Sequence, residues 1–189
     1  MPTTSTLQRK PFWAPVGLAG GAALAAALVI ALLAWLSVTA KSTTVIVLRD
    51  AETASDGGAA EAALSPAGRS RAELLARMFG DTRLKDRVDD IYVSSTPATQ
   101  ATARPLAERL GIKPTVIEPG TPHAWARRVL REHRGGRILV VTGPAMAHDL
   151  AADLSGVSDI PSIPPTEFGT MYIVAVPRIG RANLLSVVY

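Results

Sequence analysis

The hydrophobic pattern divides the chain into two unlike parts. Residues 11–40 contain no charged side chain, and the stretch 16–38 is made mostly of Ala, Leu, Val, Ile and Gly. A helix of about 20 such residues crosses the hydrocarbon core of a bilayer. The pattern therefore predicts a short cytoplasmic N-terminus (residues 1–15), one transmembrane helix (16–38) and a separate domain over residues 43–189.

The charges that flank the apolar stretch predict its orientation. Arg9 and Lys10 precede it, and only Lys41 follows closely. By the positive-inside rule the N-terminus is cytoplasmic and the domain lies on the extracytoplasmic, periplasmic side of a bacterial-type inner membrane. The small residues 38–40 also fit a signal-peptide cleavage site, and cleavage after Ala40 would instead release the domain into the periplasm. Both interpretations export the domain.

Beyond Lys41, short β-branched runs alternate with amphipathic segments. Dipeptides such as Ser65-Pro66 and Thr121-Pro122 are typical of a helix cap followed by proline in the first turn. The predicted strands are 43–48, 90–94, 115–118, 137–142, 168–176 and 182–188, and the predicted helices are 66–79, 97–110, 122–133 and 144–154. This order predicts a three-layer α/β/α sandwich with a mostly parallel sheet and a final hairpin, preceded by the transmembrane helix.

Composition excludes several classes of protein. Hydrophobic residues make up 48% of the chain, which is too many for a disordered protein. There is no cysteine, so a disulfide scaffold and thiolate chemistry are excluded. The net charge is +4, and the two basic residues Arg9 and Lys10 supply half of it, which gives little support for binding to nucleic acid.

Ligands of such sheets bind beyond the carboxyl ends of the parallel strands. In this chain those ends are the segments 49–51, 94–98, 118–121 and 142–144. We therefore expect any chemistry of the domain to be located there.

Four segments follow strand ends and helix starts in a fixed order along the chain: residues 47–53 (VLRDAET), 64–72 (LSPAGRSRA), 91–103 and 140–143. Together they resemble the histidine phosphatase (phosphoglycerate-mutase-like) superfamily. The first resembles the family's first strand, which ends in Arg-His-Gly or Arg-His-Ala, and the second fits its Leu-Ser/Thr-x-x-Gly-x-x-x-Ala segment. Residues 91–103 match a strand, a serine and a following Thr-Ala, and residues 140–143 match the last block. The resemblance extends over about residues 44–189 and implies the family's fold.

The departures from the family fall on the positions that the resemblance implies are catalytic. Asp50 stands where the family has a nucleophilic histidine, Ala98 where it has a second phosphate-binding arginine, and Gly143 where it has a second histidine. Of this pocket only Arg49 remains, and it is the candidate for binding an anion, together with the helix N-terminus at Pro144.

Losing these residues has a predictable chemical cost. The repulsion energy between an ionised Asp50 and one phosphate charge would be about 4 kcal/mol at a separation of 4 Å and an effective dielectric near 20. We therefore expect a catalytically inactive pseudophosphatase that acts as a binding or scaffold module. Its partners would be the membrane, a small anionic or phosphorylated ligand, or a protein. The alternative is a phosphomonoesterase with altered chemistry that uses Arg49 and Asp50.

Other polar residues offer weaker candidates. His148 could swing into the vacated histidine position, His123 begins a helix on the ligand side, and His133 is interpreted as structural. Glu167-Phe168 resembles an acidic-aromatic pair of the family, which core packing and turn capping explain equally well. Asp50, Glu52 and Asp56 could offer oxygen ligands to a metal, but nothing fixes their geometry, so neither a metal nor a cofactor is predicted.

Overall fold

The computed structural model describes residues 14–39, 41–54, 63–81, 87–117, 121–164 and 166–189. The chain divides into two compact units, Met1–Ala40 and Lys41–Tyr189. Each unit is described below by itself.

The first unit contains a single described helix, α1 (Ala14–Thr39), which includes the stretch 16–38. In its middle, the exposure is described for residue 21 and for residues 23–35, and all of these residues are exposed. Over the part of the chain that the structure describes, no helix meets the length and hydropathy required of a membrane span.

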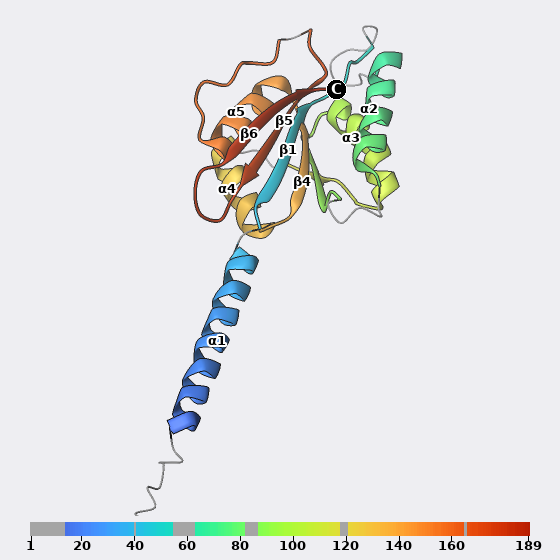
Figure 1. Cartoon of the computed structure of the whole chain (residues 1–189). Coiled ribbons are helices and arrows are strands. Elements are labelled where there is room, and N and C mark those ends of the chain that lie inside the picture. The colour runs from blue at the N-terminus through green and yellow to red at the C-terminus, as the bar shows by residue number, and fades with distance from the viewer. Residues whose placement is uncertain (1–13, 40, 55–62, 82–86, 118–120, 165) are drawn as a thin grey trace, which may run out of the picture. The chain divides into compact units, whose positions relative to one another are not determined.

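The second unit is built on one six-stranded sheet in the order β3-β2-β4-β1-β5-β6 (Figure 1). Its strands are β1 (Thr43–Arg49), β2 (Asp90–Val93), β3 (Thr115–Val116), β4 (Arg137–Thr142), β5 (Thr170–Val176) and β6 (Asn183–Val188). Strands β1, β2, β3 and β4 are parallel, and β5 pairs antiparallel with both β1 and β6. The predicted mostly parallel sheet and its final hairpin are confirmed.

Helices cover both faces of this sheet (Figure 1). On one face, α2 (Pro66–Phe79) and α3 (Pro97–Leu110) pack on a core that includes Ile46, Leu75 and Leu106. On the other, α4 (Pro122–Glu132) and α5 (Pro144–Ser155) pack on a core that includes Val47 and Leu150. Alternate residues of β1 therefore serve opposite cores, because successive side chains of a strand point to opposite faces. The three-layer prediction is confirmed for this unit.

Local signals in the sequence position the helix starts. Ser65, Thr96 and Thr121 each accept a hydrogen bond from the main-chain nitrogen three residues later, and each is followed by proline. The bounds of two strands were predicted less well. Strand β3 ends at Val116 rather than at residue 118, which lies outside the described residues, and β5 begins at Thr170 rather than Phe168. Phe168 lies in the loop before β5, where its ring packs on a buried arginine described below.

Candidate functional site

Three parallel strands end side by side on the α/β domain. The main-chain nitrogen of Asp50 donates to the Thr142 carbonyl at 2.9 Å, and that of Ser94 donates to the Val141 carbonyl at 3.0 Å. Arg49 and Thr142 are register partners in the sheet. The ends of β1, β2 and β4 are therefore held at one edge, as the sequence predicts.

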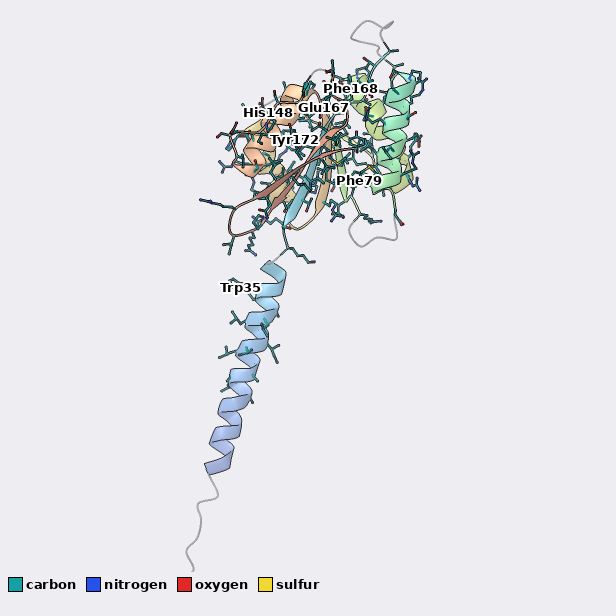
Figure 2. The ribbon with its side chains drawn as sticks, turned by 45° about the horizontal axis from the view of Figure 1, so that its top comes forward. Trp35, Phe79, His148, Glu167, Phe168 and Tyr172 are labelled. Atoms are coloured by element: carbon teal, nitrogen blue, oxygen red, sulfur yellow. The ribbon has the colours of Figure 1, made fainter. Side chains whose placement is uncertain are left out.

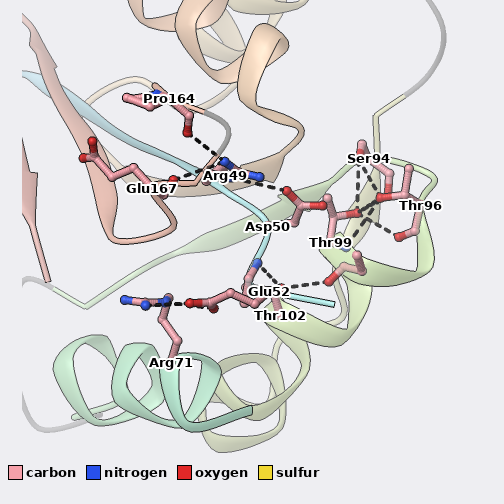
Figure 3. Close-up of polar contacts among 12 residues, drawn as sticks. Arg49, Asp50, Glu52, Arg71, Ser94, Thr96, Thr99, Thr102, Pro164 and Glu167 are labelled. Atoms are coloured by element: carbon pink, nitrogen blue, oxygen red, sulfur yellow. Dashed lines mark hydrogen bonds and ion pairs between the residues drawn. The ribbon is translucent and has the colours of Figure 1, made fainter. Parts of the chain in front are cut away.

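The first turn of α3 is joined to the same place by buried hydrogen bonds. The Thr102 hydroxyl donates to the Ala98 carbonyl at 2.7 Å and accepts from the main-chain nitrogen of Ala51 at 3.0 Å (Figure 3). Because Gly143 follows Thr142 directly, all four predicted positions meet around the end of β1: Arg49, Asp50, Ala98 and Gly143.

The Arg49 side chain faces the loop between α5 and β5 (residues 156–169, here called the α5–β5 loop). Its Nη1 atom donates to the Pro164 carbonyl at 3.2 Å and to the Glu167 carbonyl at 3.1 Å (Figure 3). Its guanidinium carbon lies 4.1 Å from the centre of the Phe168 ring, within the range of a cation–π contact. Only 7% of the residue is exposed. The arginine thus holds this loop onto the end of β1.

Asp50 is the immediate neighbour of this arginine. Its Oδ1 atom lies 3.8 Å from Arg49 Nε and has no hydrogen-bond partner among the described atoms. Burial raises the pKa of the Asp50 carboxyl above its usual value, and the Arg49 charge opposes that rise. The carboxylate therefore adds negative charge at the position where the resemblance implies a neutral imidazole.

Gly143 leaves space where the second histidine is implied. Its backbone is extended, at φ −68° and ψ 161°, and a Cβ added there would meet nothing within 4 Å. As the N-cap of α5 it makes no side-chain capping bond. The neighbouring Thr142 is 1% exposed, and its hydroxyl has no hydrogen-bond partner among the described atoms. The backbone geometry here is compatible with a larger residue.

Two other side chains hold the α5–β5 loop. His148 Nε2 on α5 is 3.0 Å from the Ile160 carbonyl, and the Tyr172 hydroxyl on β5 donates to the Pro161 carbonyl at 2.8 Å. Figure 2 shows His148 and Tyr172 on this part of the domain, near Glu167 and Phe168. The hydrogen bond to Asp149, and then that to the Ile160 carbonyl, raises the pKa of His148. In this structure His148 contacts the loop instead of occupying the position opened by Gly143.

A second polar cluster was not predicted from the sequence. Arg71 on α2 forms two hydrogen bonds with the Glu52 carboxylate, at 2.7 and 3.1 Å, and a third with the Tyr189 carbonyl at 3.1 Å. The Arg71 hydrogen bonds lower the pKa of Glu52. Burial raises the pKa of Tyr189 to about 12. The sequence separations of 19 and 118 residues left no local signal for these contacts.

The remaining candidates lie elsewhere in the domain. His123 Nδ1 is 3.5 Å from Asp153, in the last turn of α5, whereas Gly143 precedes its first turn. His133 accepts or donates at 2.7 Å with the Tyr92 hydroxyl and is 3.0 Å from Asp90. Asp56 lies outside the described residues, and within the described ones no cluster of potential metal ligands occurs.

Comparison with known proteins identifies the fold. The model of the histidine phosphatase superfamily (branch 1) matches residues 45–120, which include most of β1 and all of α2, β2, α3 and β3. The structure of the protein histidine phosphatase SixA complexed with tungstate is similar to the chain, with a TM-score of 0.61. It is 14% identical to the chain, and the alignment covers 77% of this chain and 96% of that one. This chain has the SixA-like histidine phosphatase fold.

Other structures with this fold are equally distant in sequence. A putative phosphohistidine phosphatase SixA from Agrobacterium tumefaciens has a TM-score of 0.54 at 17% identity, over 78% of this chain and 98% of its own. A mycobacterial glucosyl-3-phosphoglycerate phosphatase has a TM-score of 0.57 at 14% identity, over 76% and 97%. No curated protein matches the chain. At such identities the similarity establishes the histidine phosphatase fold, and the chemistry must be argued from this chain's own residues.

Proposed function

We propose that this chain is a membrane-anchored pseudophosphatase: a histidine-phosphatase-fold domain that does not hydrolyse phosphate esters and acts as a binding or scaffold module. One observation supports this most directly. The Arg49 guanidinium donates to the Pro164 and Glu167 carbonyls and packs on Phe168, so the only basic residue left of the implied phosphate pocket is committed to the α5–β5 loop.

The neighbouring positions support the same proposal. A carboxylate at Asp50 repels a phosphate oxygen, whereas Ala98 and Gly143 offer neither a guanidinium nor an imidazole. A preorganised donor at such a site contributes about 10²–10³ to the rate, so the loss of several lowers turnover below detection. Any small anionic or phosphorylated ligand would depend on the N-terminus of α5 and be bound weakly.

Hydrolysis of p-nitrophenyl phosphate by the full chain tests the proposal. We expect no turnover above that of an Arg49→Ala control. The triple variant Asp50→His/Ala98→Arg/Gly143→His should gain activity if the backbone of the pocket has kept its geometry. Turnover by the unaltered chain that is lost in Arg49→Ala would contradict the proposal.

A phosphomonoesterase with altered chemistry is the second candidate, and the state of Asp50 bears on it. Asp50 Oδ1 has no hydrogen-bond partner among the described atoms but is buried, so attack on phosphorus would require this carboxylate to turn toward the ligand. In that case Asp50→Asn, which keeps the shape but removes the charge, abolishes turnover, and an acyl-phosphate on Asp50 can be trapped. A silent parent chain excludes this candidate for the substrates tested.

The proposal of a membrane anchor is based on the uncharged stretch of residues 11–40 and on the basic pair Arg9 and Lys10 before it. We propose that the domain lies on the periplasmic side of a bacterial-type inner membrane. Alkaline carbonate extraction should leave the chain in the membrane pellet, and protease added to spheroplasts should digest the domain. A soluble mature chain beginning at Lys41 would show cleavage after Ala40 instead.

A further inference from the structure

Three hollows adjoin one another on the face formed by α2 and α3. The first, of about 730 Å³, runs between α3 and the edge strand β3. The second, between α2 and α3, shares Ala101, Arg104 and Glu108 with the first. The third lies on α2 and shares Arg69 and Glu73 with the second. The three hollows share lining residues in pairs and are here called together the α2–α3 furrow.

The floor and the rim of the furrow differ in chemistry. Small and apolar side chains line the part between α3 and β3, namely Val93, Ala101, Ala107, Ile112 and Val116. Val116 is 45% exposed, although it belongs to a strand. Val93 and Ala107 are buried, whereas Ala101 and Ile112 are partly exposed. Apolar surface that stays accessible in a hollow is typical of a binding site.

The charges on the rim are mainly positive. Four basic residues (Arg69, Arg77, Arg104 and Lys113) face two acidic ones (Glu73 and Glu108). Arg104 and Glu108 are one helical turn apart, yet they form no ion pair with each other, and Lys113 forms none with any described residue. Arginine placed before glutamate is the less favourable order for such a pair in a helix. Both side chains are exposed, and among the described residues neither has an acidic partner, so they offer positive charge to an acidic ligand.

The dimensions of the furrow fit an extended chain. Helix α3 has 14 residues, which corresponds to a length of about 21 Å. Six or seven residues of an extended peptide span about the same distance. Strand β3 is the last strand of the sheet on this side, so part of its main chain faces outward. Pro114 has no N–H, and recognition would therefore depend more on side chains than on strand addition.

We propose that the α2–α3 furrow binds an extended peptide segment of a partner protein, in which apolar residues alternate with acidic ones. The apolar side chains fill the floor near Ala101 and Val116, and the carboxylates pair with Arg104 and Lys113. This inference rests on the proposed function as a binding module, because it gives that module a partner. The furrow is separate from the end of β1: none of the residues that line its three hollows is Arg49, Asp50, Ala98 or Gly143.

Selection from a random twelve-residue peptide library displayed on phage, with the full-length chain in a mild detergent as target, tests this. We expect enriched peptides that combine Leu, Val or Ile with Asp or Glu. Their binding, measured by fluorescence anisotropy, should weaken as salt is raised. No enrichment, or a basic or wholly polar consensus, would overturn the proposal.

Two variants test whether the peptide binds in the furrow. Arg104→Glu reverses a charge shared by two of the hollows and should weaken binding at least about tenfold. Ala101→Leu fills the floor and should weaken it similarly. Arg127→Glu, an exposed charge reversal on α4, is the matched control and should leave binding unchanged. Thermal unfolding of each variant confirms that the domain is folded.

Two other results would also overturn the inference. If the selected peptides bind Arg104→Glu as tightly as they bind the parent chain, their binding site lies outside the furrow. A concentration-dependent dimer that Arg104→Glu dissociates, with no peptide enriched, would assign the furrow to a second copy of this chain. Hydrolysis of p-nitrophenyl phosphate by the parent would contradict the proposed function but leave the peptide measurement unaffected, so the two failures are distinguishable.

Discussion

The guanidinium carbon of Arg49 lies 4.1 Å from the centre of the Phe168 ring, and its Nη1 atom donates to two carbonyls of the same loop. Such an arginine is positioned by planar stacking and by a fork of donors, which a point charge does not reproduce. Arg49, which the family resemblance implies would bind phosphate, thus has a structural role at the edge of the sheet where a ligand would enter.

Replacing Arg49 by lysine should therefore destabilise the domain although the charge is kept. The ammonium cannot reproduce both hydrogen bonds together with the contact to Phe168. We expect the free energy of unfolding to fall by about 2–3 kcal/mol, measured by urea denaturation. Arg77→Lys, an exposed change on α2, should alter it by less than about 0.5 kcal/mol. Equal losses in both variants would contradict the structural role of Arg49.

The His148 contact predicts that the α5–β5 loop depends on pH. The hydrogen bonds to Asp149 and Ile160 raise the pKa of His148, so its stabilising effect is complete below the ordinary histidine pKa and is lost as pH rises through the raised value. Amide exchange in residues 157–164 should therefore be slower at pH 5.5 than at pH 8.5, after correction for the intrinsic rate. In His148→Gln that difference should disappear; if it persists, another group is responsible.

Much of this fold could be predicted because its signals are local. The β-branched runs predicted where β1 and β4 lie. The dipeptides Ser65-Pro66 and Thr121-Pro122 predicted two helix starts that the structure confirms. The same pattern placed Arg49 at a strand end. It could not show where that side chain points, because Pro164 and Glu167 are 115 and 118 residues away in sequence.

Part of the missing information was nevertheless visible in the sequence. Glu167-Phe168 stood out as an acidic-aromatic pair, and the structure gives each residue a contact. The Thr170 hydroxyl donates to the Glu167 carboxylate, which caps the turn, and the Phe168 ring packs against Arg49. The Glu52–Arg71 pair had no such signal, since charged residues are common along the chain and only the fold decides which of them meet.

The Glu52–Arg71 pair should stabilise the domain in a pH-dependent way. Its hydrogen bonds lower the pKa of Glu52, so the stabilisation is present above the ordinary glutamate pKa and is lost as pH falls through the lowered one. At pH 7, Glu52→Gln should reduce the free energy of unfolding by about 1–2 kcal/mol. The difference should shrink below pH 4. Glu73→Gln, exposed on the same helix α2 as Arg71, should show neither effect.

Two glycines make a matched pair for substitution by alanine. At Gly68 a Cβ would lie 2.2 Å from the Glu52 carbonyl oxygen, whereas at Gly143 it would meet nothing within 4 Å. We expect Gly68→Ala to cost about 2–3 kcal/mol and Gly143→Ala to change stability by less than about 0.5 kcal/mol, from thermal unfolding. A large cost at Gly143 would show that the position has no room for a histidine, and would exclude the triple variant as a test of the pocket.

The hydrogen bonds that hold the α5–β5 loop have a consequence for how this protein can change. His148, Tyr172 and Arg49 all contact main-chain carbonyls, at Ile160, Pro161, Pro164 and Glu167. A carbonyl is present whatever residue occupies the position, so substitutions at these four sites leave the acceptors in place. Homologous chains could therefore diversify the side chains of this loop, and with them what it recognises, without losing the attachment that holds it against the sheet.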